Sequence, residues 1–229
     1  MSMRRNQGFT LIEIAIVLVI IGLLLGGVLK GQELITGARV RNLISQQDGI
    51  KAAFFGFQDR YRALPGDYSA ADPNIKCGDT PCPNGNGNGR IETGNETILV
   101  WTHLTAAGFM NGSYRANSGA TTPDDANTPK NPYSSYLQVI YDANYGDPSG
   151  TSSSKHNLKT GTQVPVEIIA EVDRKIDDGR PYTGSFQFST YSAATGGEPA
   201  AANCVDGTGG SGNWKIADGE TNCGGASLF

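Results

Sequence analysis

Hydrophobic and polar positions divide the sequence sharply near residue 30. From Phe9 to Leu29 the 21 residues are almost all apolar, and Glu13 is the single charged residue among them. A helix of that length, rising ~1.5 Å per residue, spans the ~30 Å hydrocarbon core of a bilayer. The pattern therefore predicts an apolar helix that lies in lipid or against other apolar helices.

Helical spacing continues beyond this apolar run. Apolar residues recur three or four positions apart, and no proline occurs before Pro65. We therefore predict one helix from about Thr10 to about Arg62, roughly 80 Å long, ended by the Leu64-Pro65-Gly66-Asp67 turn. Its second half, residues 31–62, is amphipathic, and its aromatic stripe is expected to lie under a globular domain: Ile50, Phe54, Phe57 and Tyr61.

The remaining sequence, residues 63–229, is patterned as a small α+β head. Alternation predicts strands at about Ser135–Tyr141 and Ser185–Tyr191. Helices are expected at about Glu96–Ala107, capped by Asn95, and from Pro165 to the Gly179 stop. Residues 142–161 and the C-terminal forty are expected as loop. The predicted fold is a long helix packed on a small antiparallel sheet, with extra short helices and long loops.

Composition refines this prediction. The 229 residues include 31 glycines, and the formal net charge is −4. A Gly-rich, polar head suits an exported domain with many turns. The net negative charge disfavours non-specific electrostatic binding of nucleic acid, which requires clustered Lys and Arg.

Four cysteines indicate disulfides in an exported domain. Three pairings exist, and we favour Cys77 with Cys82 and Cys204 with Cys223, because each pair brackets a short, turn-rich loop. A four-cysteine zinc site is the weaker alternative, since neither pair has the two-residue spacing of a zinc knuckle.

An Asn/Gly loop resembles a calcium-binding loop. Oxygen-bearing side chains alternate, with glycine at the sixth position and an apolar residue at the eighth. The candidate ligands are Asn84, Asn86, Asn88, Arg90 through its carbonyl, Glu92, Asn95 and Glu96. Neutral asparagines predict weak binding, and the alternative is a turn cluster closed by a disulfide.

Enzyme-like strings are short and lack the required context. Ser152-x-x-Lys155 lies in a serine tract, and the Gly-x-Gly-x-x-Gly string at 207–212 has no predicted strand before it. Neither His103 nor His156 belongs to a recognisable set of catalytic residues in the sequence. We therefore expect no enzyme activity.

The basic start MSMRRNQG and the run Gly8-Phe9-Thr10-Leu11-Ile12-Glu13 together resemble the prepilin signature of type IV pilins and type II secretion pseudopilins. The resemblance implies that a prepilin peptidase removes the leader, residues 1–8, by cutting between Gly8 and Phe9. It also implies N-methylation of Phe9. Residues 9–30 would then form the transmembrane and filament-core half of the helix.

The family resemblance gives Glu13 an assembly role. A carboxylate in an apolar span is costly without a partner, and cleavage would create a positive amine at Phe9 in the same subunit or its neighbour. Gly22, Gly26 and Gly27 weaken the helix by ~1 kcal/mol each relative to Ala, so local flexibility in the filament is expected there, although the proline that many pilins carry is absent.

The resemblance implies two functions, and the membrane-spanning pattern leaves open a third from another class. The leading one is a structural pilin of a type IV pilus-like extracellular filament, with itself, the prepilin peptidase, the inner-membrane assembly platform and membrane lipid as partners. A type II secretion pseudopilin is the alternative. A membrane-anchored, exported binding protein that never polymerises is the third. The chain is expected as a single-pass inner-membrane protein before assembly and as an extracellular or periplasmic filament afterwards. Adhesion, motility, DNA uptake and secretion are not distinguished.

Overall fold

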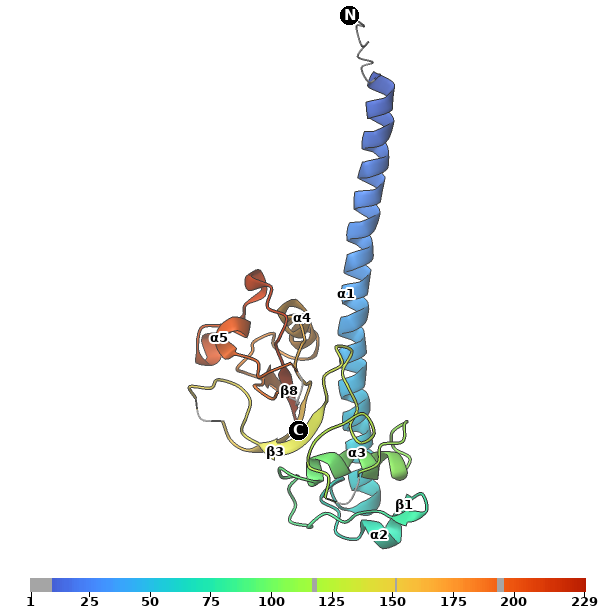
Figure 1. The fold of residues 1–229 in the computed structure, drawn as a ribbon. Coiled ribbons are helices and arrows are strands. Elements are labelled where there is room, and N and C mark those ends of the chain that lie inside the picture. Colours follow the sequence, from blue (N-terminus) through green and yellow to red (C-terminus); the bar gives the residue numbers. More distant parts are fainter. Residues whose placement is uncertain (1–9, 117–118, 151, 193–195) are drawn as a thin grey trace, which may run out of the picture. The chain divides into compact units, whose positions relative to one another are not determined.

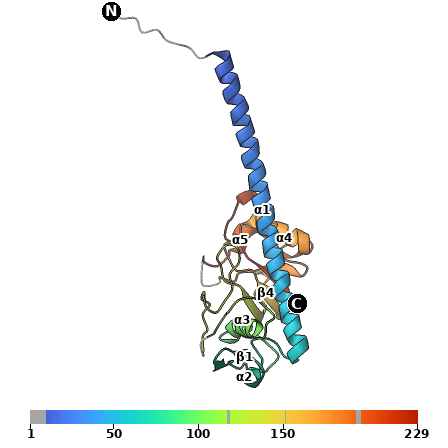
Figure 2. The same cartoon turned by 90° about the vertical axis from the view of Figure 1, so that its right-hand side faces the viewer.

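The computed structural model describes residues 10–116, 119–150, 152–192 and 196–229. The chain divides into two compact units, the first ending at Arg39 and the second comprising Val40–Phe229. Helix α1, Leu11–Tyr61, contributes to both units (Figures 1 and 2). Its bounds agree within one residue with the helix expected from the spacing of apolar positions.

In the first unit, α1 buries no residue of its apolar run. The large side chains from Leu11 to Leu29 are between 46 and 93 % exposed. Lys30 and Glu33 form an exposed ion pair of 2.7 Å one turn apart. The apolar side chains of this unit therefore find no partner within the described part of the chain.

In the second unit, the same helix becomes a core element. The buried side chains of α1 all lie in this part: Val40, Leu43, Gln47, Ile50, Ala53, Phe54 and Phe57. Phe57 is fully buried and stacks on His103 with ring planes 8° apart. The predicted aromatic stripe therefore does lie under the head.

A four-stranded antiparallel sheet lies in the head. Its strands are β3 (Gln138–Asp142), β4 (Lys155–Lys159), β5 (Phe186–Phe188) and β8 (Gly225–Leu228), and their order is β3-β4-β8-β5. The α+β fold class is confirmed. The predicted strand sites at β3 and β5 are also confirmed, with shorter bounds than expected.

The expectation of loop at residues 142–161 is wrong in part, because β4 lies there. Its sequence is polar, yet Asn157, Leu158 and Lys159 are all buried. Lys159 donates to Asp142 Oδ1 at 3.0 Å and to the Asn144 carbonyl at 2.7 Å, which pairs its charge inside the protein. Strand prediction depends on apolar residues that alternate with exposed polar residues. Because the polar residue Lys159 is buried, β4 does not show that alternation.

The C-terminal segment is likewise more ordered than the expected loop. Strand β8 lies between β4 and β5 in the sheet. A Cβ built on Gly225 would lie 2.3 Å from the Phe186 ring, so glycine makes room for a large neighbour. Small residues in β8 therefore suit this position but carry little strand propensity.

Two larger helices accompany the sheet. Helix α3, Glu96–Ala106, and helix α4, Val166–Ile176, lie where the sequence predicts helices. Asn95 occupies the N-cap position of α3, as predicted, and its carbonyl accepts the Ile98 and Leu99 N–H groups, but its side chain makes no capping hydrogen bond. Gly108 and Gly179 adopt positive φ after the two helices, as expected of helix stops.

Short elements complete the head. They are α2 (Ala71–Asn74), β1 (Lys76–Cys77), β2 (Thr80–Pro81), α5 (Ala201–Cys204), β6 (Val205–Asp206), β7 (Asn213–Trp214) and two 3-10 turns, η1 (Gly209–Ser211) and η2 (Ile216–Asp218). Disulfides join Cys77 to Cys82 and Cys204 to Cys223, the two pairings favoured from the sequence, so the zinc alternative is wrong.

The head has two apolar clusters. One gathers Phe54 and Phe57 with α3 and with Leu137, Val139 and Leu158. The other gathers Val40 and Leu43 with α4, Phe186, Phe188 and Trp214. Each disulfide lies in one cluster, and α1 lies in both. The helix therefore connects two cores that the chain builds from separate segments.

Candidate functional site

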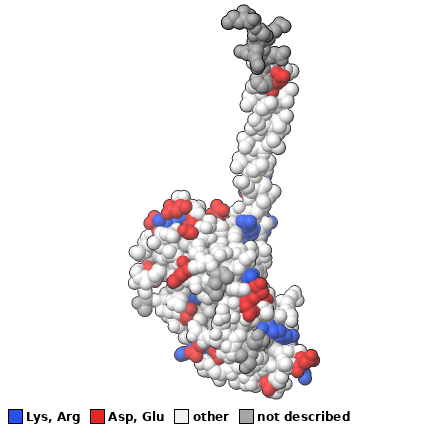
Figure 3. All heavy atoms as spheres, in the orientation of Figure 1, with Lys and Arg blue, Asp and Glu red and all other residues white. Residues whose placement is uncertain are grey.

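The first candidate site is the N-terminal part of α1. Its apolar segment is long enough to cross a membrane by length and composition, and none of its residues is buried. Figure 3 shows this part of α1 as an almost uninterrupted stretch without charged side chains. A continuous apolar surface of this kind is suited to lipid or to copies of the same helix.

Glu13 occupies the first turn of α1 and closes a capping box with Thr10. The Thr10 N–H and hydroxyl both donate to Glu13 Oε2 at 2.7 Å, and the Glu13 N–H donates to Thr10 Oγ1 at 3.3 Å. The T-x-x-E spacing is a known signature of a helix start, so this feature was readable from the sequence and was missed. It holds the carboxylate at the helix N-terminus, where the helix dipole also favours negative charge.

The predicted cleavage and methylation residues, Gly8 and Phe9, lie outside the described residues. Gly22, Gly26 and Gly27 lie in continuous helix, and a Cβ built on any of them would meet nothing within 4 Å. The model therefore places these glycines on an open helix surface. Their flexibility in an assembled filament stays a prediction.

The second candidate site is the Asn/Gly loop, which is organised around two buried carboxylates. The backbone N–H groups of Gly87 and Asn88 donate to Asp67 Oδ1, and that of Gly89 donates to Asp67 Oδ2, at 2.7 to 3.0 Å. Glu96 accepts the backbone N–H groups of Asn86 and Glu92 at 3.1 and 3.0 Å. Sequence reasoning missed the role of Asp67, because it lies 20 positions before the loop residues that it binds.

The side chains proposed as calcium ligands are only partly brought together. A cavity of about 240 Å³ is lined by the predicted residues Asn84, Asn86, Glu92, Asn95 and Glu96. Asn88 and Arg90 do not line it. The side-chain oxygens of Asn84, Asn86 and Asn88 accept the backbone N–H groups of Asp72, Asn88 and Arg90, respectively. Calcium binding at this loop stays a prediction.

The two histidines have structural surroundings. His103 is buried, its Nδ1 accepts the Gly66 N–H at 2.9 Å, and its Nε2 lies 2.8 Å from the Pro83 carbonyl. Burial lowers the pKa of His103, against a raising effect of the Pro83 hydrogen bond. His103 therefore fastens the Pro65–Gly66 turn to α3 as a neutral imidazole.

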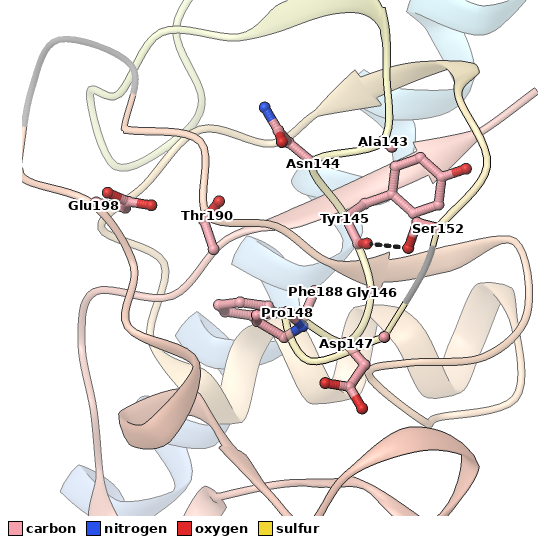
Figure 4. Close-up of a pocket in the computed structure, with 11 residues that line it drawn as sticks. Ala143, Asn144, Tyr145, Gly146, Asp147, Pro148, Ser152, Phe188, Thr190 and Glu198 are labelled. Atoms are coloured by element: carbon pink, nitrogen blue, oxygen red, sulfur yellow. Dashed lines mark hydrogen bonds between the residues drawn. The ribbon is translucent and has the colours of Figure 1, made fainter.

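A further cavity, of about 300 Å³, lies between the loop after β3 and the segment after β5 (Figure 4). Ser152 Oγ donates to the Tyr145 carbonyl there. Hydrogen bonds from Ser149 and Gly209 lower the pKa of Asp147 and hold its carboxylate in a turn. The described residues that line this cavity include no histidine, cysteine or lysine, so they supply no nucleophile with a base beside it.

Comparison with known proteins identifies the N-terminal segment. Residues 3–29 match the family model described as the prokaryotic N-terminal methylation motif, which is the signature of type IV pilins and pseudopilins. The motif supports that class of protein, whose members are structural subunits. No match was found among curated proteins or among solved structures.

Proposed function

We propose that this chain is a pilin, a structural subunit of a type IV pilus-like extracellular filament. The observation that carries the proposal is the apolar half of α1, in which no side chain is buried, with the methylation motif at its start. A prepilin peptidase would remove residues 1–8, and the inner-membrane platform would assemble the mature chain. Before assembly the apolar half lies in the inner membrane, and afterwards it lies against other copies.

The energetics support transfer from lipid to a bundle of helices. Full burial of one Leu, Ile or Val side chain contributes about 1.5–3 kcal/mol relative to water. The apolar run of α1 contains many such side chains, so its exposure to water would be prohibitive. Lipid and a bundle of identical helices both remove that surface from water, and the bundle adds the Phe9 amines of neighbouring subunits as possible partners for Glu13.

The proposed partner of Glu13 is the Phe9 amine of the neighbouring subunit. Within the described part of the apolar run there is no Lys or Arg. The capping box with Thr10 holds the carboxylate near the end of the helix at which cleavage would create the amine. Pairing of the two charges in an apolar bundle would offset the desolvation of both and fix the axial stagger between helices.

N-terminal mass spectrometry of sheared surface filaments tests the processing. The expected mature chain begins at Phe9 and carries one methyl group on its amine. A chain that retains residues 1–8 in the filament, or a protein never recovered from filaments, would contradict the proposal.

Substitution tests the assembly role of Glu13. Glu13→Leu should leave the leader processed and lower filament yield at least tenfold, measured by immunoblot of sheared fractions against membrane fractions. The control is Glu33→Gln, which removes an exposed carboxylate of the same helix outside the apolar run and should assemble normally. Normal filament yield from Glu13→Leu would exclude the proposed charge-pairing role of Glu13.

The pseudopilin and monomeric-anchor alternatives give different outcomes. A pseudopilin carries the same motif, so deletion of the gene should then abolish secretion of exported proteins while leaving surface filaments intact. Cross-linking of native membranes separates the third function, because a monomeric anchor gives no ladder of multiples of the chain mass.

We also propose weak calcium binding at the Asn/Gly loop, supported by the cavity that five of the predicted ligands line. Glu92→Gln is the informative variant, because within the described part of the chain the Glu92 carboxylate accepts a hydrogen bond from the Asn88 side-chain amide alone. The calcium-dependent rise in melting temperature should be smaller in Glu92→Gln than in the unmodified chain, and an equal rise in both would exclude the loop site.

A further inference from the structure

Three aspartates converge at the C-terminal end of α4. Asp173, Asp177 and Asp178 each offer a carboxylate oxygen, and these oxygens lie within 4.8 Å of one another. Asp173 is fully buried, whereas Asp177 is half-buried and Asp178 is exposed. The last residues of the helix and the turn that follows it thus bring three acidic groups into one small volume.

This arrangement is electrostatically unfavourable as it stands. The C-terminal end of a helix carries partial negative charge and favours cations over anions. Neighbouring basic side chains are committed elsewhere: Arg174 and Lys175 pair with Glu171 at 2.7 and 3.1 Å, and Arg180 Nη1 donates to the Gly210 carbonyl. Lys51 of α1 acts on Asp177, but it is shared with Asp48. The three carboxylates are therefore under-compensated by the described residues.

Asp173 supplies an independent observation. Its Oδ2 accepts the indole N–H of Trp214 at 2.7 Å, while its buried Oδ1 has no hydrogen-bond partner in the described structure. A buried carboxylate oxygen without a partner is unfavourable, because it has lost its hydrogen bonds to water without replacement. Burial raises the pKa of Asp173 to about 7, and the charges of Asp178 and Asp177 add to this effect, whereas hydrogen bonds from Trp214 and from the Gly179 backbone act against it.

The other two carboxylates are already oriented by the turn. Asp177 Oδ2 accepts the Ser185 and Phe186 N–H groups, and Asp178 accepts the Arg180 N–H and the Thr183 hydroxyl. A Cβ on Gly184 would collide with the Asp177 carboxylate, so glycine is required for this approach. The donors fix both side chains near Asp173 and leave each carboxylate with acceptor capacity, since a carboxylate has about four lone-pair sites.

We propose that Asp173, Asp177 and Asp178 form a binding site for one divalent cation, with calcium as the ion that fits. All three ligands are hard oxygen donors, and calcium accepts such ligands at 2.3–2.6 Å with flexible geometry. Two ligands on opposite sides of the ion then lie at most about 5 Å apart, in line with the 4.8 Å limit that all three oxygens meet. Water would complete the coordination on the exposed Asp178 side.

The ion would connect three segments of the head. Asp173 belongs to α4, Asp177 and Asp178 belong to the following turn, and Trp214 belongs to β7. Trp214 and α4 share the second apolar cluster, in which Cys204 and Cys223 also lie. Binding is therefore expected to stabilise that cluster rather than the one around Phe57.

Terbium luminescence tests the site on the full-length chain in detergent micelles, because terbium replaces calcium at oxygen sites and is sensitised by a nearby tryptophan. We expect emission on tryptophan excitation that calcium competes away. Asp178→Asn should weaken terbium binding at least tenfold. The matched control is Asp206→Asn, an exposed aspartate in β6 of the same cluster, and it should bind as the unmodified chain does.

Melting temperature separates a binding defect from a folding defect. In EDTA, Asp178→Asn should melt within a few degrees of the unmodified chain, because an asparagine keeps one acceptor oxygen at this exposed position. Added calcium should raise the melting temperature of Asp178→Asn less than that of the unmodified chain, and Glu92→Gln should keep the part of the rise that the aspartate site supplies. Terbium binding in Asp178→Asn as tight as in the unmodified chain, no terbium emission from the unmodified chain, or complete loss of the calcium effect in Glu92→Gln would each overturn the proposed aspartate site. An equal effect of magnesium would overturn the choice of calcium.

Discussion

The two parts of α1 differ in where their apolar side chains find partners. From Leu11 to Leu29 the helix buries no residue, whereas from Val40 to Phe57 it contributes seven buried residues to the head. Helical backbone geometry is the same in both parts, so hydrogen bonding within the helix does not distinguish them. The difference shows that one helix can be stabilised by its own chain at one end and requires outside partners at the other.

The largest effect on the head should come from the core part of α1. Phe57→Ala removes a fully buried ring that contacts Tyr61, Tyr68, His103 and Phe109. We expect a loss of about 3–5 kcal/mol in the free energy of unfolding, measured by chemical denaturation in micelles. A loss below about 1 kcal/mol would mean that this part of α1 is not a core element.

The second-largest loss of stability should come from removal of the disulfide that closes the longer loop. The Cys204–Cys223 bridge spans 19 positions, and the loss of such a loop constraint costs about 3 kcal/mol in the chain-entropy account. The bridge between Cys77 and Cys82 spans only 5 positions, and its removal should cost about 2 kcal/mol. Double serine variants of each pair measure both costs by denaturation. The opposite order would show that native-state contacts, and not loop length, decide these costs.

A smaller, pH-dependent effect is expected from His103. Its folded pKa lies below the unfolded value of about 6.5, so the folded state binds fewer protons than the unfolded state as pH falls. Stability from this group is therefore present above about pH 6.5 and is lost as the pH drops through the folded pKa.

The His103→Gln variant measures this dependence. Glutamine keeps a donor toward the Pro83 carbonyl and does not titrate, so the decline in unfolding free energy between about pH 7 and pH 5 should become shallower. His156 is the other histidine that could give such a pH dependence, because burial also lowers its pKa, against the charge of Asp67. An unchanged pH profile in His103→Gln would show that His103 is not the group that titrates.

The smallest effect belongs to the exposed part of α1. Leu24 is 63 % exposed, so Leu24→Ala should change the unfolding free energy of the head by less than about 0.5 kcal/mol. The same variant should weaken filament yield, because its partners lie in other copies. A loss of head stability comparable to that of Phe57→Ala would remove the distinction between the two parts.

Periodic features of this chain could be predicted from its sequence, and features that depend on distant partners could not. The long helix follows from apolar spacing without proline, and α4 follows from its amphipathic pattern. Strand β4 was missed because Lys159 is buried against Asp142. Strand β8 was missed because Gly225 and Ala226 have low strand propensity, and the reason for a small residue at Gly225 is its contact with the distant Phe186 ring. In both cases the deciding partner lies well outside a local sequence window.

The same reasoning applies to the candidate sites. The methylation motif and Glu13 are local patterns, and the sequence alone indicated them. The role of Asp67 in the Asn/Gly loop depends on hydrogen bonds across 20 or more positions. Asp177 and Asp178 are adjacent in the sequence, but Asp173 lies one helical turn earlier, and its bond from Trp214 spans 41 positions. The convergence of the three acids therefore depends on the fold and is not a local sequence pattern.

The place of β8 in the sheet has a consequence for the order in which the strands can pair. Because β8 lies between β4 and β5, the four strands cannot form one sheet until residues 225–228 are in place. β3 and β4 can pair as a hairpin without β8, whereas β5 pairs with β8 in this sheet. A chain truncated before Gly225 should therefore keep the β3–β4 hairpin and leave β5 outside the sheet.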